Sequence, residues 1–176
     1  MCLDGDFEEV RAALQSGVDV NSMDGHGWMD GLTGLMGSLA NGHTEVASLL
    51  LEQEGIDINI ISDYRNETAL HFAAQDDQNN ECLAMLLARN TSVNQRDSFG
   101  GTPLHDAVQY NAVRCVQLLI SDERTDPNIK SDDGESPMMC AVKQNHVNCV
   151  ELLLADPRVD LMTRDNYERD EEEATR

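Results

Sequence analysis

The chain has 176 residues, and 40% of them are hydrophobic, which is enough to build the core of one domain. Its 33 acidic and 12 basic residues give a formal net charge of -21, which repels phosphate backbones and anionic membrane surfaces. The composition therefore argues against nucleic-acid binding and favours a cationic partner. It also contains no apolar run of the roughly 20 residues that cross a bilayer, so we expect no membrane association.

The first residues of the sequence and its cysteines indicate the cellular compartment. Residues 1–6 lack the basic segment with which a signal peptide begins. The five cysteines are odd in number and have no disulfide-framework spacing, which is typical of a reducing compartment. We therefore expect the chain to be cytoplasmic or nuclear.

A repeated unit organises the chain. Thr33, Thr68, Thr102 and Ser136 each open a similar short string, and they lie 35, 34 and 34 positions apart. Each hydroxyl is predicted to cap a first helix by accepting a backbone N–H. Later apolar runs predict a second helix in each unit, at residues 49–51, 86–87, 118–120 and 152–154. An extended piece ending in asparagine precedes each unit, with Asn21, Asn59, Asn94 and Asn128 at these ends.

This unit resembles the ankyrin repeat over residues 5–166, and its strongest match is residues 97–107, DSFGGTPLHDA. The resemblance implies an all-α solenoid of helix–turn–helix pairs linked by β-hairpin fingers. It also implies a protein-binding module that is not an enzyme. Met36 and Met139 stand where the family usually has His, which removes a side-chain hydrogen bond between adjacent fingers.

We divide the chain, as one domain, by this register. The parts are a partial N-terminal cap (1–24), repeat 1 with a finger insertion (25–57), repeat 2 (58–91), repeat 3 (92–125), repeat 4 (126–158), and a short C-terminal cap with an acidic tail (159–176). The N-terminal part matches only a second helix, so its first helix would begin before residue 1. A natural array, a trimmed piece and an engineered derivative all stay open.

The cysteines, histidines and glycines that could form a metal, catalytic or phosphate-binding site are each better explained by a structural role in the repeat. Cys82, Cys115 and Cys149 recur at one position of successive repeats, roughly 10 Å apart, which is too far to share a metal ion and favours the core. His71 and His105 occupy the fixed His position of the repeat. The glycines of residues 25–31 lack the spacing of a phosphate-binding loop. We expect no catalytic residue, no metal and no cofactor.

In ankyrin proteins, finger tips and inner helices line a concave groove that binds partners. Carried over by register, the candidates here are Trp28, Met29, Leu32, Tyr64, Arg65, Glu67, Phe72, Asp76, Phe99, Asp106, Tyr110, Asp132, Asp133 and Glu135. Exposed aromatics would anchor a ligand and the carboxylates would attract it, so we expect a monomer that binds a basic protein or peptide with apolar anchors.

Three alternatives stay open. Trp28 either lies exposed on a lengthened finger tip or folds back on the stack. The groove either has a ligand or belongs to a structural scaffold whose acidic charge only maintains solubility. The finger residues Asn59, Asn94 and Asn128 resemble positions that are hydroxylated in some ankyrin proteins.

Overall fold

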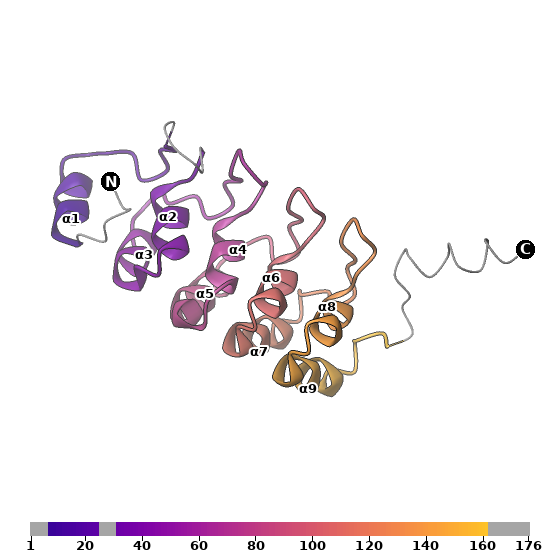
Figure 1. Ribbon diagram of the computed structural model, residues 1–176. Coiled ribbons are helices and arrows are strands. Elements are labelled where there is room, and N and C mark those ends of the chain that lie inside the picture. The colour runs from indigo at the N-terminus through magenta and orange to yellow at the C-terminus, as the bar shows by residue number, and fades with distance from the viewer. Residues whose placement is uncertain (1–6, 25–30, 162–176) are drawn as a thin grey trace, which may run out of the picture.

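The computed structural model describes residues 7–24 and 31–161 as a row of stacked helix pairs (Figure 1). The helices in these ranges are α1 (Phe7–Gln15), α2 (Gly34–Ala40), α3 (Thr44–Leu51), α4 (Ala69–Ala74), the 3-10 helix η2 (Asp77–Asn79), α5 (Asn80–Leu87), α6 (Pro103–Gln109), α7 (Val113–Ser121), α8 (Pro137–Lys143) and α9 (Val147–Ala155). No helix among them is long and apolar enough to cross a membrane.

The helices form two rows. The inner helices α2, α4, α6 and α8 pack on one another in sequence, and each also packs on the outer helix that follows it. The outer row is α1, α3, α5, α7 and α9 (Figure 1). Leucines such as Leu35, Leu70 and Leu104 are buried between the rows, and Ala73 and Ala107 are small enough to let the helices approach closely. The expected all-α solenoid is confirmed.

The hydroxyl residues start the inner helices as predicted. Thr33 Oγ1 accepts the backbone N–H of Met36 at 3.3 Å, and Ser136 caps α8 in the same way. In the third repeat, the N–H of Thr102 donates to Nδ1 of His105 at 3.1 Å, so the proton of this ring is on Nε2. Nε2 then donates to the carbonyl of Glu135 in the next finger, at 3.0 Å. Met139 has no ring with which to make this link.

The turns between the helices need left-handed backbone. Gly42, Asn111 and Asn145 have φ values of 70°, 53° and 58°, as their residue types predict. The second repeat instead inserts the 3-10 helix η2. There Asp77 Oδ1 accepts the backbone N–H groups of Arg114 and Cys115 at 2.8 and 3.1 Å, where it caps α7 of the next repeat.

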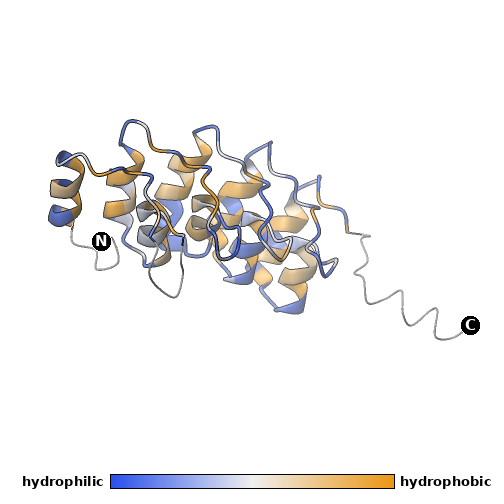
Figure 2. Cartoon of the chain, turned by 90° about the horizontal axis from the view of Figure 1, so that it is seen from above, coloured by the Kyte–Doolittle hydropathy of each residue, from blue (hydrophilic) through white to orange (hydrophobic). Residues whose placement is uncertain are grey.

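The fingers are hairpin-shaped loops and not strand ladders, which corrects the expectation of β-hairpins. In the described ranges the only β pairing is an isolated bridge between Met23 and Thr33. In the finger of the third repeat, the N–H of Asp97 donates to the carbonyl of Gly101 at 2.8 Å, and the N–H of Gly100 donates to the carbonyl of Asp97 at 3.1 Å. Figure 2 shows these loops as mainly hydrophilic, against mainly hydrophobic helices.

An asparagine joins each finger base to the next. Its Nδ2 donates to a backbone carbonyl at the base of the following finger, and its Oδ1 accepts the N–H two residues beyond that carbonyl. The bonded pairs of residues are Gly55 and Asp57 for Asn21, Asn90 and Ser92 for Asn59, Arg124 and Asp126 for Asn94, and Arg158 and Asp160 for Asn128. We call this contact the asparagine clamp.

The clamp yields a stability prediction. Asn94→Ala removes two hydrogen bonds of 2.8 and 2.9 Å to the next repeat. We expect it to lower the free energy of unfolding by about 1–2 kcal/mol, measured by urea denaturation. The nearby exposed Ser92→Ala is the control and should change it by less than ~0.5 kcal/mol. Equal effects of the two substitutions would contradict the role of the clamp.

Candidate functional site

The concave face holds a hollow of about 340 Å³ between three fingers and three inner helices. Its walls come from the second, third and fourth repeats. The lining residues are Arg65, Glu67, Gln75, Asp97, Phe99, Gly101, His105, Asp106, Gln109, Tyr110, Ser131, Asp133, Glu135 and Cys140. The lining therefore holds five carboxyl groups and one arginine, so the hollow is acidic. We call it the groove hollow.

Backbone hydrogen bonds between fingers set the shape of the hollow. The N–H of Ser98 donates to the carbonyl of Arg65 at 2.7 Å, and the N–H of Asp132 donates to the carbonyl of Phe99 at 2.9 Å. Gly100 has a φ of 75°, and a Cβ at this position would collide with the backbone of Asp132. The close approach of the third and fourth fingers therefore requires glycine there.

Three of the predicted aromatics are exposed on the groove side. Tyr64 is 64% exposed, Phe99 57% and Tyr110 56%. Phe99 and Tyr110 line the groove hollow directly. The guanidinium of Arg65 lies 5.0 Å from the centre of the Phe99 ring, in cation–π geometry. An exposed aromatic ring and the chain's own arginine therefore lie side by side at this hollow.

Three predicted groove residues are buried, so the expectation that Phe72 and Leu32 present their side chains to a partner is wrong, while buried Glu67 still lines the groove hollow. Phe72 is 4% exposed, because a large apolar ring at its position in α4 gains by turning into the core. Leu32 is 5% exposed and directly precedes the cap of α2, as Glu67 precedes the cap of α4. Trp28 and Met29 lie outside the described residues.

Several predicted carboxylates have internal partners. Asp132 pairs with Arg96 at 2.9 Å, and Glu135 pairs with Lys143 at 2.5 Å. Asp76 accepts the backbone N–H of Gln78 at 2.8 Å, so it caps η2 as well as edging the groove. Asp133 is exposed and lines the groove hollow.

The floor of the hollow carries two carboxyl groups with perturbed acidity. Burial and, to a smaller extent, the nearby carboxyl of Glu67 raise the pKa of Asp106 to about 8. Burial also raises the pKa of Glu67, although Arg65, 4.0 Å away, opposes this. Gln75 donates weakly to both, at 3.4 Å to Glu67 and 3.5 Å to Asp106. Asp106 is thus mainly uncharged at neutral pH, and a cation in the hollow would ionise it.

Sequence reasoning missed Asp97 as a groove residue. Its Oδ1 accepts the N–H of Phe99 at 2.9 Å and that of Gly101 at 2.7 Å, which holds the finger tip in shape. It lies close enough to raise the pKa values of Glu67 and Asp106. The sequence could have indicated this role, because Asp97 lies four residues before Gly101 in the segment that matches the repeat most strongly.

Two buried histidines and the four cysteines of the described residues lie in environments that disfavour reactivity. Burial lowers the pKa of His71 to about 4 and also lowers that of His105, so both rings are neutral. Burial and the neighbouring Glu135 raise the pKa of Cys140 to about 12, which disfavours the reactive thiolate. Cys82, Cys115 and Cys149 are buried in the core, as predicted. In residues 7–24 and 31–161, no group of three or more His, Cys, Asp or Glu is placed to hold a metal ion.

The sequence profile described as ankyrin repeats (3 copies) matches residues 1–97 and 73–165. The chain belongs to the ankyrin-repeat family. Ankyrin repeats are a non-catalytic fold that mediates contacts between proteins.

Longer proteins carry similar ankyrin repeats. A probable E3 ubiquitin-protein ligase of Oryza sativa subsp. japonica is 35% identical over 120 residues, which cover 68% of this chain and 23% of that protein. A probable serine/threonine-protein kinase of Dictyostelium discoideum is 29% identical over 121 residues, 65% of this chain and 14% of the kinase. Inversin of Gallus gallus is 37% identical over 90 residues, 51% of this chain and 8% of inversin. The chain thus spans less than a quarter of the length of these relatives.

The raised pKa of Asp106 predicts how stability depends on pH. The folded state keeps a proton up to a pKa of about 8, whereas an ordinary aspartate releases it near 3.8, so stability falls as the pH rises between these values. Asp106→Asn removes this loss. We expect it to raise the free energy of unfolding by about 1–3 kcal/mol near pH 8 and to change it little near pH 4. Urea denaturation at both pH values measures this, and equal effects at both would refute the assignment.

Proposed function

We propose that this ankyrin array is a protein-binding module whose concave groove binds a basic segment of a partner, with a Lys or Arg side chain in the groove hollow. The supporting observation is the pairing of exposed aromatic rings with an acidic floor. Phe99 and Tyr110 lie at the wall of the hollow, and the carboxyls of Glu67 and Asp106 lie within it. Aromatic anchors beside a charged pocket are the usual basis of binding energy and specificity in interfaces.

The environment of Arg65 supports a cationic group as the occupant of the hollow. Its guanidinium lies 5.0 Å from the Phe99 ring centre and 4.0 Å from a Glu67 oxygen. A partner's cation would meet the same combination of ring face and carboxylate. It would also ionise Asp106, whose pKa of about 8 reflects burial and the nearby carboxyl of Glu67, which Arg65 offsets only in part. The net charge of -21 would speed the approach of such a partner.

The aromatic anchors can be tested with a defined probe. Tyr64→Ala/Phe99→Ala/Tyr110→Ala should weaken binding of a fluorescein-labelled peptide of alternating lysine and leucine by at least about 100-fold, because each exposed ring contributes ~1–2 kcal/mol. Fluorescence anisotropy measures the affinity. A matched control, Val147→Ala/Leu154→Ala, removes exposed apolar side chains of α9 and should bind as the wild type does.

Two results would refute the groove assignment. One is unchanged affinity in the triple variant. The other is affinity that does not fall when the salt concentration rises from about 0.05 to 0.5 M, since exposed charge attraction is screened over that range.

The ionisation of Asp106 predicts a pH dependence of binding. A bound cation stabilises the charged carboxylate, so binding below a pH of about 8 must release a proton. The affinity for the same peptide should therefore rise several-fold between about pH 6 and pH 8 in the wild type. Titration calorimetry in two buffers of different ionisation enthalpy measures the released proton. Asp106→Asn should abolish both the proton release and the pH dependence, and their persistence in this variant would place the titrating group elsewhere.

A further inference from the structure

The groove hollow already contains a guanidinium group, that of Arg65. Its central carbon lies 5.0 Å from the centre of the Phe99 ring, and one of its nitrogens lies 4.0 Å from an oxygen of Glu67. Among the described residues that line this hollow, Arg65 is the only Lys or Arg. A partner's cation would therefore find the ring and the carboxyl occupied. We call the Phe99 ring and the Glu67 carboxyl the guanidinium site.

The side chain of Arg65 is held more weakly than those of three other arginines. Arg96, Arg124 and Arg158 each donate to backbone carbonyls and pair with an aspartate at 2.6 to 2.9 Å. Within residues 7–24 and 31–161 the guanidinium of Arg65 donates no hydrogen bond, and its side chain is 43% exposed. An exposed cation–π contact and an ion pair of 4.0 Å are each weak. Arg65 can therefore leave the site at small cost.

The backbone that carries Arg65 is fixed, so only the side chain would move. The carbonyl of Arg65 accepts the N–H of Ser98 from the next finger at 2.7 Å. The N–H of Ser62 donates to the carbonyl of Glu67 at 2.8 Å, which closes the finger around Arg65. The guanidinium can thus turn out to solvent while the walls of the hollow keep their shape.

A partner's guanidinium would gain a contact that Arg65 lacks. Gln75 Nε2 lies 3.4 Å from a carboxyl oxygen of Glu67 and 3.5 Å from one of Asp106, so one donor group reaches both carboxyls. Within the described chain neither carboxyl accepts a backbone N–H, and Arg65 pairs only with Glu67. A guanidinium that enters from the open side of the hollow can donate to both carboxyls.

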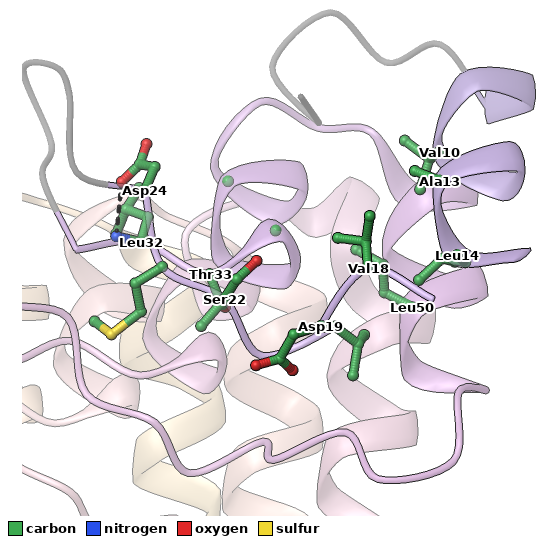
Figure 3. Close-up of a pocket in the computed structure, with 14 residues that line it drawn as sticks. Val10, Ala13, Leu14, Val18, Asp19, Ser22, Asp24, Leu32, Thr33 and Leu50 are labelled. Carbon is green, nitrogen blue, oxygen red and sulfur yellow. Dashed lines mark hydrogen bonds between the residues drawn. The ribbon is translucent and has the colours of Figure 1, made fainter. Parts of the chain in front are cut away.

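A second hollow, of about 200 Å³ at the N-terminal end of the stack, provides a contrast (Figure 3). Its lining is mainly apolar. Its two carboxylates, Asp19 and Asp24, accept the backbone N–H groups of Asn21 and Leu32 at 3.0 and 3.1 Å. They stabilise the chain itself. Of these two hollows, the groove hollow alone combines an aromatic ring with two carboxyls that accept no backbone N–H.

The chemistry of the guanidinium site favours arginine over lysine as its occupant. A guanidinium is planar, weakly hydrated and able to stack on a ring while its spread donors reach separate carboxyls. An ammonium is compact and strongly hydrated, so it loses more on leaving water and stacks less well. The position of Arg65 over Phe99 shows that a group of this shape fits.

We propose that Arg65 occupies the guanidinium site in the unbound chain, and that a partner binds by replacing it with an arginine of its own. This inference rests on the proposed function. Arg65 then acts as a built-in competitor, because only the fraction of molecules in which it has left the site can accept the partner. It thereby determines the apparent affinity of the groove.

The choice of arginine is tested with two fluorescein-labelled peptides of equal charge, one of alternating arginine and leucine and one of alternating lysine and leucine. Fluorescence anisotropy measures their affinities for the wild type. We expect the arginine peptide to bind about fivefold more tightly, because only its cation stacks well on Phe99. In Phe99→Leu, which keeps an apolar side chain but no ring, this preference should fall below about twofold.

The competition is tested with Arg65→Gln. This variant should bind the arginine peptide about threefold to tenfold more tightly than the wild type, which corresponds to a site that Arg65 fills about two thirds to nine tenths of the time. Arg114→Gln, at an exposed position of α7, makes the same change in net charge and should alter the affinity by less than about twofold. Circular dichroism checks that both variants are folded.

The NMR signals of the Arg65 side chain report the displacement directly. In the free chain the Phe99 ring should shift the Cδ protons of Arg65 upfield, relative to their position in Phe99→Leu. Saturation of the wild type with the arginine peptide should remove this shift, because the side chain then lies in solvent.

Four outcomes would overturn the proposal. They are a lysine peptide that binds as tightly as the arginine peptide, weaker binding in Arg65→Gln, equal tightening in Arg65→Gln and Arg114→Gln, and a ring-shifted Arg65 signal that persists in the complex. Failure of the proposed function would look different, because neither peptide would then bind the wild type or Arg65→Gln. That result would overturn both proposals.

Discussion

The stack depends on contacts between neighbouring repeats, because no single helix pair here can bury its apolar faces alone. The asparagine clamp is the contact that fixes their spacing. An inner and an outer helix of six to nine residues expose apolar surface on both sides, and only the neighbouring repeat covers it. The clamp fixes where that neighbour lies. Asn21, Asn59, Asn94 and Asn128 each bind the two equivalent backbone atoms at the base of the following finger, at distances of 2.7 to 3.2 Å. Successive finger bases are thus held at one spacing.

The groove follows from that spacing. Because successive finger bases are clamped, their tips meet closely enough for the N–H of Ser98 to bond Arg65 and for that of Asp132 to bond Phe99. The Nε2 of His105 adds a third link, to the carbonyl of Glu135. These bonds align Arg65, Phe99 and Asp133 on one wall, although they belong to three repeats. The site is rigid for the same reason that the stack is stable.

The parts of the structure that repeat could be predicted from the sequence, and the parts that depend on one side chain could not. Helix starts at Thr102 and Ser136 and left-handed turns at Asn111 and Asn145 follow from local chemistry that recurs in every unit. Register places Phe72 and Asp106 at the same position of an inner helix. It cannot tell that the phenyl ring turns into the core while the carboxyl stays at the hollow. Nor can one sequence show that burial raises the pKa of Asp106, because that depends on Glu67 from another repeat.

Two polar side chains of the groove hollow differ in how well they are hydrogen-bonded. The ring of His105 is hydrogen-bonded on both nitrogens. In the hollow, Asp106 has one weak donor, Gln75 at 3.5 Å, among the described residues, and its pKa of about 8 records the free-energy cost of ionising it there. A stack that needed only to be stable would do better with an amide or a methyl group at this position. A carboxyl that becomes favourable when a cation arrives is consistent instead with binding as the property for which the position is used.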